Sequence, residues 1–136
     1  MTDFVLDPRL ENDSSSILVT GLCDVRLSHD ARWPWLVLVP RRADITEIFE
    51  LRPLDQVLLT LELELVAGAL KKVTGAAKIN VGALGNIVRQ LHVHIVARFE
   101  GDANWPGPVW GFGSAEAYED GKRDALIAKL REALSP

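Results

Sequence analysis

The sequence predicts an α+β domain in which a mainly antiparallel sheet is crossed by one long helix and followed by a C-terminal helix. Three patterns predict it: short β-prone runs before residue 40, helical spacing of leucines after Pro53, and strict alternation over 91–99. The chain has 136 residues, 48% apolar and 25% charged, as in an ordinary globular protein. We therefore expect residues 1–136 to form a single domain.

The first 40 residues are expected to contribute a surface lead-in and short strands. Residues 1–16 end in Asn, Asp and three serines, which favours a polar segment on the surface. The runs 17–23 and 24–28 are β-prone, with Gly21 as a bend between them. Residues 35–39 are apolar throughout and precede a proline, so this strand needs cover on both of its faces.

Two helices are expected. Pro53 suits the first turn of the long one, and Gly75 suits its end. Its leucines recur at helical spacing, with Glu62 elsewhere on the helical wheel, which predicts an apolar stripe. The leucines of this stripe are Leu54, Leu58, Leu61 and Leu65. Ser114 can cap a C-terminal helix over residues 114–134.

Two histidines stand two residues apart in the alternating segment, which follows a short strand at 78–81 and a glycine-containing loop at 82–86. The odd-numbered residues of 91–99 are apolar and would face the core. Gln90, His92 and His94 would share the opposite face. The sequence therefore predicts a polar row on the sheet beside a loop that can supply backbone N–H groups.

Three interpretations of this row are open from the residues alone. It can be a solvated sheet face, because alternation by itself requires a polar side. It can be half of a metal site, but a third ligand is needed, and His29 and Cys23 stand at no telling spacing. It can act on phosphate, because an imidazole nitrogen can attack phosphorus while donors from the loop bind the phosphoryl oxygens.

At these residues the sequence resembles the histidine-triad (HIT) superfamily, whose signature is His-φ-His-φ-His-φ-φ with φ apolar. The stretch here reads Gln90-Leu91-His92-Val93-His94-Ile95-Val96, after a lead-in Gly85-Asn86-Ile87-Val88-Arg89. Further matches, in the family's order over residues 17–110, are Ile79-Asn80-Val81, the strand 35–40 followed by Arg41-Arg42, and Asn104-Trp105-Pro106-Gly107.

The resemblance implies a HIT-like fold with a five-stranded sheet and a mechanism. His92 occupies the position of the nucleophile that takes the nucleotidyl group from an α-phosphate. His94 occupies the position that supports the phosphate and orients the nucleophile, and Gln90 stands in place of the first catalytic histidine. Hydrolysis or transfer at the α-phosphate of a nucleoside phosphoramidate or dinucleoside polyphosphate is the activity implied, with no cofactor and no metal.

The resemblance also implies binding residues and a partner. Asn80 and Asn86 would contact phosphate or ribose, with Gly85 and Ile87 in the same phosphate-binding loop. A two-fold homodimer is implied. Trp105 lies in a Pro/Gly-rich loop, where a large aromatic side chain needs cover, so it is a candidate lid or partner contact.

Two departures from the family pattern suggest an alternative function. Gln90 cannot carry a proton near neutral pH, and Ile87 stands where a hydroxyl residue is usual. The leaving group would then lack a proton donor. General acid catalysis by such a donor raises the rate by about 10²–10⁴-fold. The alternative is a nucleotide-binding module with little or no turnover.

Charge and hydropathy exclude other classes. The net charge of -4 argues against nucleic-acid polymers as partners. No stretch reaches the roughly 18 uninterrupted apolar residues that span a bilayer. Residues 1–10 lack a secretory pattern, so we expect a cytoplasmic protein without membrane contact.

Overall fold

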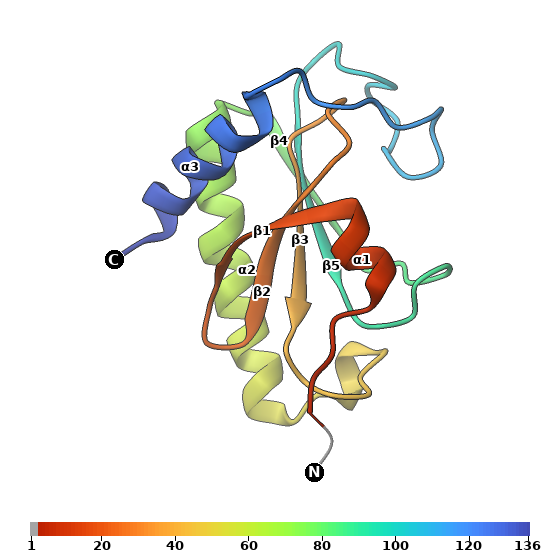
Figure 1. Ribbon diagram of the computed structural model, residues 1–136, viewed down its shortest axis with the longest axis vertical. Coiled ribbons are helices and arrows are strands. Elements are labelled where there is room, and N and C mark those ends of the chain that lie inside the picture. The colour runs from red at the N-terminus through yellow and green to blue at the C-terminus, as the bar shows by residue number, and fades with distance from the viewer. Residues whose placement is uncertain (1–2) are drawn as a thin grey trace.

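The computed structural model describes residues 3–136 and has an α+β fold around one five-stranded sheet (Figure 1). The strand order is β1-β2-β3-β5-β4 and every neighbouring pair is antiparallel, which confirms the predicted fold class. The elements are α1 (Pro8–Asp13), β1 (Ser14–Val19), β2 (Cys23–Ser28), β3 (Trp35–Pro40), η1 (Ile48–Glu50), α2 (Pro53–Thr74), β4 (Lys78–Gly82), β5 (Val93–Arg98) and α3 (Lys122–Leu134).

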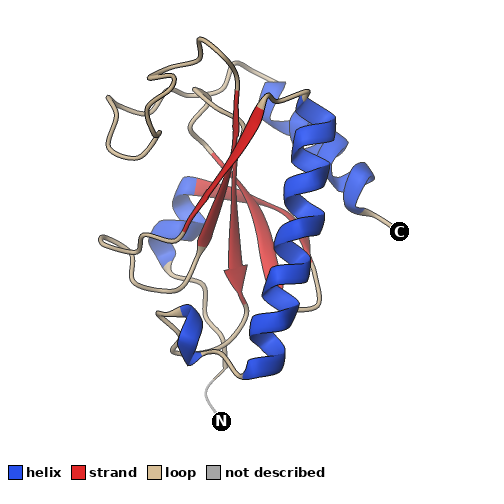
Figure 2. Cartoon of the chain, turned by 180° about the vertical axis from the view of Figure 1, so that it is seen from behind, coloured by secondary structure: helices blue, strands red, loops and turns tan. Residues whose placement is uncertain are grey.

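The sheet is covered on both faces. Helices α2 and α3 lie on one face, and α2 runs along the sheet in the rear view (Figure 2). The main hydrophobic core lies between these helices and the sheet and includes Leu36, Val66, Ile95 and Leu130. On the other face, Leu10 of α1 packs against β3 in a second cluster. The apolar strand at 35–39 therefore has the cover on both faces that its sequence requires.

The long helix has the predicted ends but buries a different face. Pro53 begins α2, and Gly75 ends it in the left-handed conformation, with its N–H donated to the Lys71 carbonyl. Three of the four leucines predicted as an apolar stripe are exposed, whereas Glu62 is buried. The prediction failed because α2 carries apolar residues almost all round, so that periodicity alone does not select the face.

Burial of Glu62 has a specific cause. Its carboxylate accepts hydrogen bonds from the backbone N–H of Leu22 (2.9 Å) and of Cys23 (3.1 Å), and from the Thr20 hydroxyl. These groups form the turn between β1 and β2. A turn whose donors point at a helix needs an acceptor there, and Glu62 provides it.

Both ends of the chain differ from the sequence prediction. Residues 8–13 form α1, and Ser14 already begins β1, so the surface lead-in to residue 16 was wrong for these residues. The C-terminal helix begins at Lys122 rather than at residue 114. The segment before α3 bonds to other backbone instead, because the Ala31 N–H donates to the Glu116 carbonyl at 2.7 Å.

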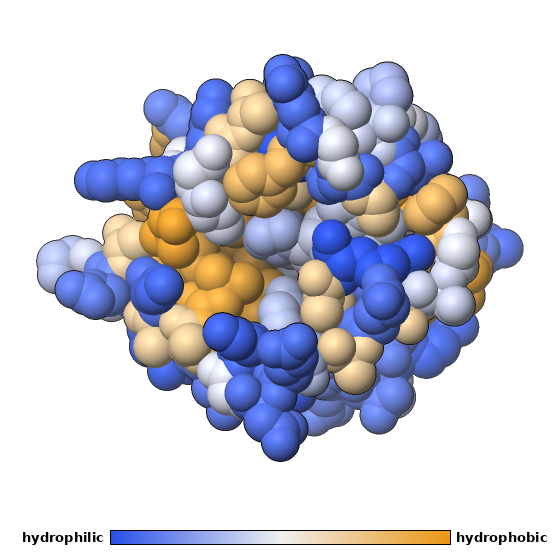
Figure 3. All heavy atoms as spheres, turned by 90° about the horizontal axis from the view of Figure 1, so that it is seen from above, coloured by the Kyte–Doolittle hydropathy of each residue, from blue (hydrophilic) through white to orange (hydrophobic). Residues whose placement is uncertain are grey.

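The surface keeps apolar areas. A view from above shows apolar residues gathered in a hollow bordered by hydrophilic residues (Figure 3). The large exposed apolar side chains include Leu54, Val57, Leu61 and Leu65 of α2 and Val81 of β4. Within residues 3–136, none of the helices combines the length and the apolar character needed to cross a membrane.

Candidate active site

The two histidines meet on the sheet face that α1 covers. His94 lies in β5, where it pairs with Val37 of β3, and His92 directly precedes the strand. Because side chains two residues apart in extended chain share a face, both rings point the same way. The ring centroids are 4.9 Å apart. His92 is 7% exposed and His94 is half-buried.

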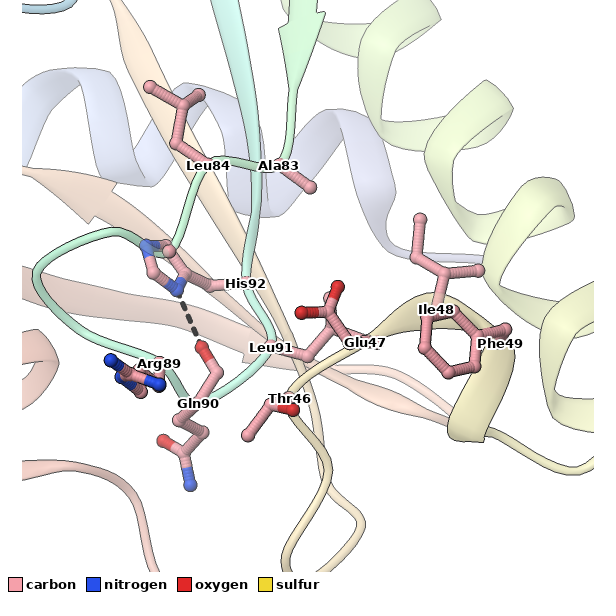
Figure 4. Close-up of a pocket in the computed structure, with 11 residues that line it drawn as sticks. Thr46, Glu47, Ile48, Phe49, Ala83, Leu84, Arg89, Gln90, Leu91 and His92 are labelled. Atoms are coloured by element: carbon pink, nitrogen blue, oxygen red, sulfur yellow. Dashed lines mark hydrogen bonds between the residues drawn. The ribbon is translucent and has the colours of Figure 1, made fainter.

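A backbone contact fixes the His92 ring. Its Nδ1 lies 2.7 Å from the carbonyl oxygen of Gln90 (Figure 4). A carbonyl can only accept, so Nδ1 must carry the hydrogen and Nε2 must hold the free lone pair. Neutral His92 is therefore fixed in the tautomer that an imidazole nucleophile requires.

A side-chain contact fixes the His94 ring in the opposite sense. The indole Nε1–H of Trp35 donates to Nδ1 of His94 at 2.9 Å. An indole can only donate, so Nδ1 is the acceptor and Nε2 carries the hydrogen. Burial, with a smaller contribution from the charge of His92, lowers the pKa of His94 to about 4. Near neutral pH, His94 is thus a neutral hydrogen-bond donor.

A cleft of about 470 Å³ opens above the histidines. The α1 helix forms one wall with Leu10 and Asp13, and Trp110 lines the cleft from the 100–113 loop. Trp110 packs edge-on against the His94 ring, with centroids 5.7 Å apart. The remaining lining residues are Ser14, Ser28, Trp35, Val37, Leu84, Gly85, Asn86, Ile87, Val88 and Gly111.

A second, smaller cavity of about 170 Å³ meets the first at His92. Leu84, Gly85 and His92 line both cavities. The second cavity extends toward Glu47 and Phe49, which Figure 4 shows on the far side of Leu91 from the His92 ring. His92 therefore stands between the two cavities.

The loop predicted to bind phosphate lies in the cleft. Gly85, Asn86 and Ile87 all line it beside His92. Gly85 adopts a φ of +72°, and an added Cβ would lie 3.4 Å from the Val88 carbonyl oxygen, so glycine suits the turn. Ile87 is 83% exposed and brings an apolar side chain to the place where the family pattern has a hydroxyl.

Asn80 lies elsewhere. It pairs with Val96, one same-face step along β5 from His94, and lines neither cavity that contains the histidines. Its Oδ1 accepts from Nη1 of buried Arg98 at 3.0 Å. Arg98 is also paired with Asp102 at 2.8 Å. The structure thus places Asn80 in an ion-pair cluster that anchors the 100–113 loop, rather than at the cleft.

Two further predicted site residues make contacts that the sequence did not indicate. The Gln90 side chain points away from the His92 ring (Figure 4) and binds backbone near the N-terminus, so only its carbonyl serves the histidines. Trp105 packs on Arg98, with the guanidinium 5.5 Å from the ring centroid, and Trp110 is the loop tryptophan that lines the cleft. The sequence signal was the same for both tryptophans, and only the fold separates them.

The two other candidates for a third metal ligand lie away from the pair. His29 Nε2 is 2.7 Å from the Ser15 hydroxyl, and Cys23 is buried in the main core. Burial also raises the pKa of the Cys23 thiol, which argues against a thiolate ligand. Residues 3–136 hold no group of three or more His, Cys, Asp or Glu side chains arranged for a metal ion.

The comparisons with known proteins agree with this fold. The HIT domain family model matches residues 9–101. A histidine triad protein from Sinorhizobium meliloti is 62% identical, with a TM-score of 0.94 over 96% of this chain and 97% of that one. One from Bradyrhizobium japonicum is 42% identical, with a TM-score of 0.96 over 98% and 100% of the two chains.

A third solved structure, a histidine triad protein from Marinobacter aquaeolei, is 41% identical, with a TM-score of 0.94 over 98% of this chain and 97% of that one. None of the curated proteins matches the sequence. The family model and these structures show that the chain belongs to the histidine-triad family.

Proposed function

We propose that this protein is a nucleotide-binding hydrolase or transferase that acts at the α-phosphate of a nucleotide conjugate, such as a nucleoside phosphoramidate or a dinucleoside polyphosphate. The observation that carries the proposal is the pair of fixed tautomers. His92 presents a free Nε2 lone pair, and His94 presents an N–H beside it. One ring can attack while the other stabilises the charge of the attacked group.

The reaction follows from these roles. Nε2 of His92 attacks phosphorus and forms a P–N bond, while the bond from phosphorus to the leaving group breaks and its electron pair leaves with that group. The His92 imidazolium of the adduct is stabilised by the Gln90 carbonyl, which accepts its Nδ1–H. Water, or another acceptor, then displaces His92 and releases the nucleoside monophosphate or its transfer product.

The surroundings supply the charge stabilisation. The Nε2–H of His94, the Asn86 side chain and the backbone of the 84–88 loop line the same cleft and can donate to phosphoryl oxygens. Leu10, Val37 and Trp110 offer apolar surface for a base in the larger cavity. A Sulfolobus tokodaii structure described as a histidine triad nucleotide-binding protein shares the fold at 17% identity and a TM-score of 0.69.

The experiment that tests the mechanism is detection of the covalent adduct. The protein is incubated with adenylated and guanylated conjugates, quenched in alkali and examined by mass spectrometry. We expect a nucleotidyl adduct on His92 and its loss in His92→Ala, with folding checked by circular dichroism. An adduct on another residue, or full turnover in His92→Ala, would refute the mechanism.

A nucleotide-binding module without turnover is the second candidate function, and Ile87 favours it. This exposed side chain brings no hydrogen-bond donor to the leaving group. The same incubation separates the two functions, because a module would bind nucleoside monophosphate by calorimetry and yield neither adduct nor product.

We also propose that two copies associate through α2. Leu61 and Leu65 are 56% and 57% exposed and lie one helical turn apart. Together with Leu54 and Val57 they form an apolar stripe that no other described part of the chain covers. A stripe of this kind is typical of a protein interface.

A further inference from the structure

The Gln90 side chain bonds to the N-terminal strap, defined here as residues 5–9, which are the segment before α1 and the first two residues of that helix. Its Oε1 accepts the backbone N–H of Asp7 at 2.8 Å, and its Nε2 donates to the Val5 carbonyl at 2.8 Å. The primary amide thus pairs with the strap backbone much as a neighbouring strand would. The Gln90 side chain thus bonds to two residues that lie 83 and 85 positions before it in the sequence.

The strap has a second contact with the loop of the site. Arg9 donates from Nη1 to the Ile87 carbonyl at 3.2 Å. Arg9 is also paired with Asp7 at 3.1 Å, and the Asp7 carboxylate caps α1 by accepting the Arg9 backbone N–H. Strap, helix cap and loop therefore form one connected set of contacts.

The strap leads directly into a wall of the cleft. Helix α1 begins at Pro8, and its Leu10 packs on Val37 and Val39 while lining the cleft together with Asp13. A six-residue helix is too short to be stable by itself. Its position must therefore come from tertiary contacts such as the strap.

We propose that Gln90 is a positioning residue that holds the α1 wall in place for the nucleotide, an inference that rests on the proposed function. The backbone and the side chain of Gln90 contact different parts of the site. Its carbonyl fixes the His92 tautomer, and its amide fixes the wall opposite the histidines. The amide is needed because the strap presents one donor and one acceptor, which a carboxylate cannot both satisfy.

Gln90→Glu tests the inference with an isosteric change that keeps the acceptor and removes the donor. We expect two backbone amides to exchange hydrogen faster in Gln90→Glu: that of Asp7, and that of Glu11, which donates to the Asp7 carbonyl at 3.1 Å. We expect AMP to bind about tenfold more weakly, the scale of losing one or two hydrogen bonds. In turnover, KM should rise by a similar factor while kcat changes less than twofold, because the carbonyl that holds His92 is retained.

Gln56→Glu is the matched control. It makes the same chemical change at a glutamine whose amide donates to the Leu51 carbonyl and which lines neither cavity. AMP affinity and exchange at Asp7 should stay as in the unsubstituted chain. Equal effects from the two variants would mean that added charge, not the strap, is responsible, and would overturn the proposal.

A second substitution approaches the same contact from the strap. Asp7 has a φ of -56°, which proline adopts, so Asp7→Pro removes the N–H donor without forcing the backbone, and Asp7→Ala removes only the carboxylate. AMP binding should be weaker in Asp7→Pro than in Asp7→Ala, and Asp7→Pro with Gln90→Glu should be less than additive. Full additivity, or unchanged AMP binding after loss of the strap contact, would refute the positioning role.

The outcomes separate this inference from the proposed function. If the unsubstituted chain binds no AMP and forms no adduct, the proposed function fails. Exchange at Asp7 and Glu11 then still decides whether Gln90 holds the strap. If AMP binds and exchange at Glu11 is the same in Gln90→Glu as in the unsubstituted chain, the inference fails and the proposed function stands.

Discussion

At the residue scale, the two histidines have different tasks because they have different partners. His92 bonds to a carbonyl and His94 to an indole N–H, so the hydrogen sits on opposite ring nitrogens. Hydrogen-bond partners, not the motif, determine which ring presents a lone pair and which a donor. Because His94 stays neutral near pH 7, its Nδ1 can keep accepting from Trp35 while its Nε2–H is free to donate.

The lowered pKa of His94 makes the stability of the fold depend on pH. The folded pKa, about 4, is below the value near 6.5 of an unfolded histidine. As pH falls below 6.5, the unfolded chain binds this proton first, so the free energy of unfolding decreases until about pH 4 and this effect then levels off. We expect His94 to account for about 2–3 kcal/mol of the decrease.

Urea unfolding at a series of pH values measures this effect. In His94→Asn, which keeps a side chain able to accept from Trp35, the decrease between pH 6.5 and 4 should be smaller by that amount. Burial also lowers the pKa of His29, but this residue is present in both proteins and cancels in the difference. Identical pH dependence in the two proteins would contradict the assignment.

Trp35→Phe is predicted to release the His94 tautomer. The ring keeps apolar contact with Trp110, but the donor to Nδ1 is lost. His94 can then carry its hydrogen on either nitrogen, so fewer molecules present Nε2–H to the phosphate. We expect kcat to fall about tenfold, the scale of one hydrogen bond. Nitrogen chemical shifts of the His94 ring report the tautomer directly, and an unchanged Nε2–H form would exclude this role.

The sequence predicted part of the site for a clear reason. Alternation over residues 91–99 predicts that His92 and His94 share a face near the adjacent loop, and in the structure both histidines and this loop line one cleft. Asn80 was predicted to contact phosphate or ribose, and Trp105 to be a lid or a partner contact, on weaker signals. Their partner, Arg98, is chosen by the register of β4 and by the path of a long loop, which no local pattern encodes.

At the element scale, α2 illustrates the limit of periodicity. Its ends were predicted because Pro53 and Gly75 act through local backbone geometry. Its buried face was not, because the face depends on the β1–β2 turn and its need for the Glu62 carboxylate. Glu62 is buried there because its carboxylate accepts from the backbone donors of the turn. Leaving those donors without an acceptor would cost more free energy than desolvating a carboxylate that has hydrogen-bond partners.

Replacement of Glu62 should therefore destabilise the fold. Glu62→Ala leaves the N–H of Leu22 and the Thr20 hydroxyl without this acceptor, and we expect a loss of about 2–4 kcal/mol in the free energy of unfolding. Glu62→Gln keeps one oxygen acceptor and should lose less. Glu64→Ala, at an exposed position of the same helix, is the control and should stay within about 0.5 kcal/mol. Equal unfolding midpoints for Glu62→Ala and Glu64→Ala would disprove the role of Glu62 as the hydrogen-bond acceptor for this turn.

At the scale of the whole molecule, the order of strands and helices followed from local signals, since each strand is bounded by turn residues or loops. Local signals could not predict which apolar residues are buried in the core and which stay exposed. That distinction matters for assembly, because three of the four leucines predicted as the buried stripe of α2 are exposed. The leucines do form an apolar stripe on α2, but no other part of residues 3–136 covers it.

The last prediction concerns that partner. If α2 is the interface of a homodimer, Leu61→Lys with Leu65→Lys places two charges in an apolar contact, where each buried charge lacks a counter-ion. We expect the unsubstituted chain to sediment as a dimer and the double variant as a monomer at micromolar concentration. Val19→Lys is the control, because Val19 is 53% exposed on β1, at the sheet edge opposite β4, and should leave the dimer intact. A monomeric unsubstituted chain, or a dimeric double variant, would exclude this interface, and the exposed leucines would then have to serve a different partner.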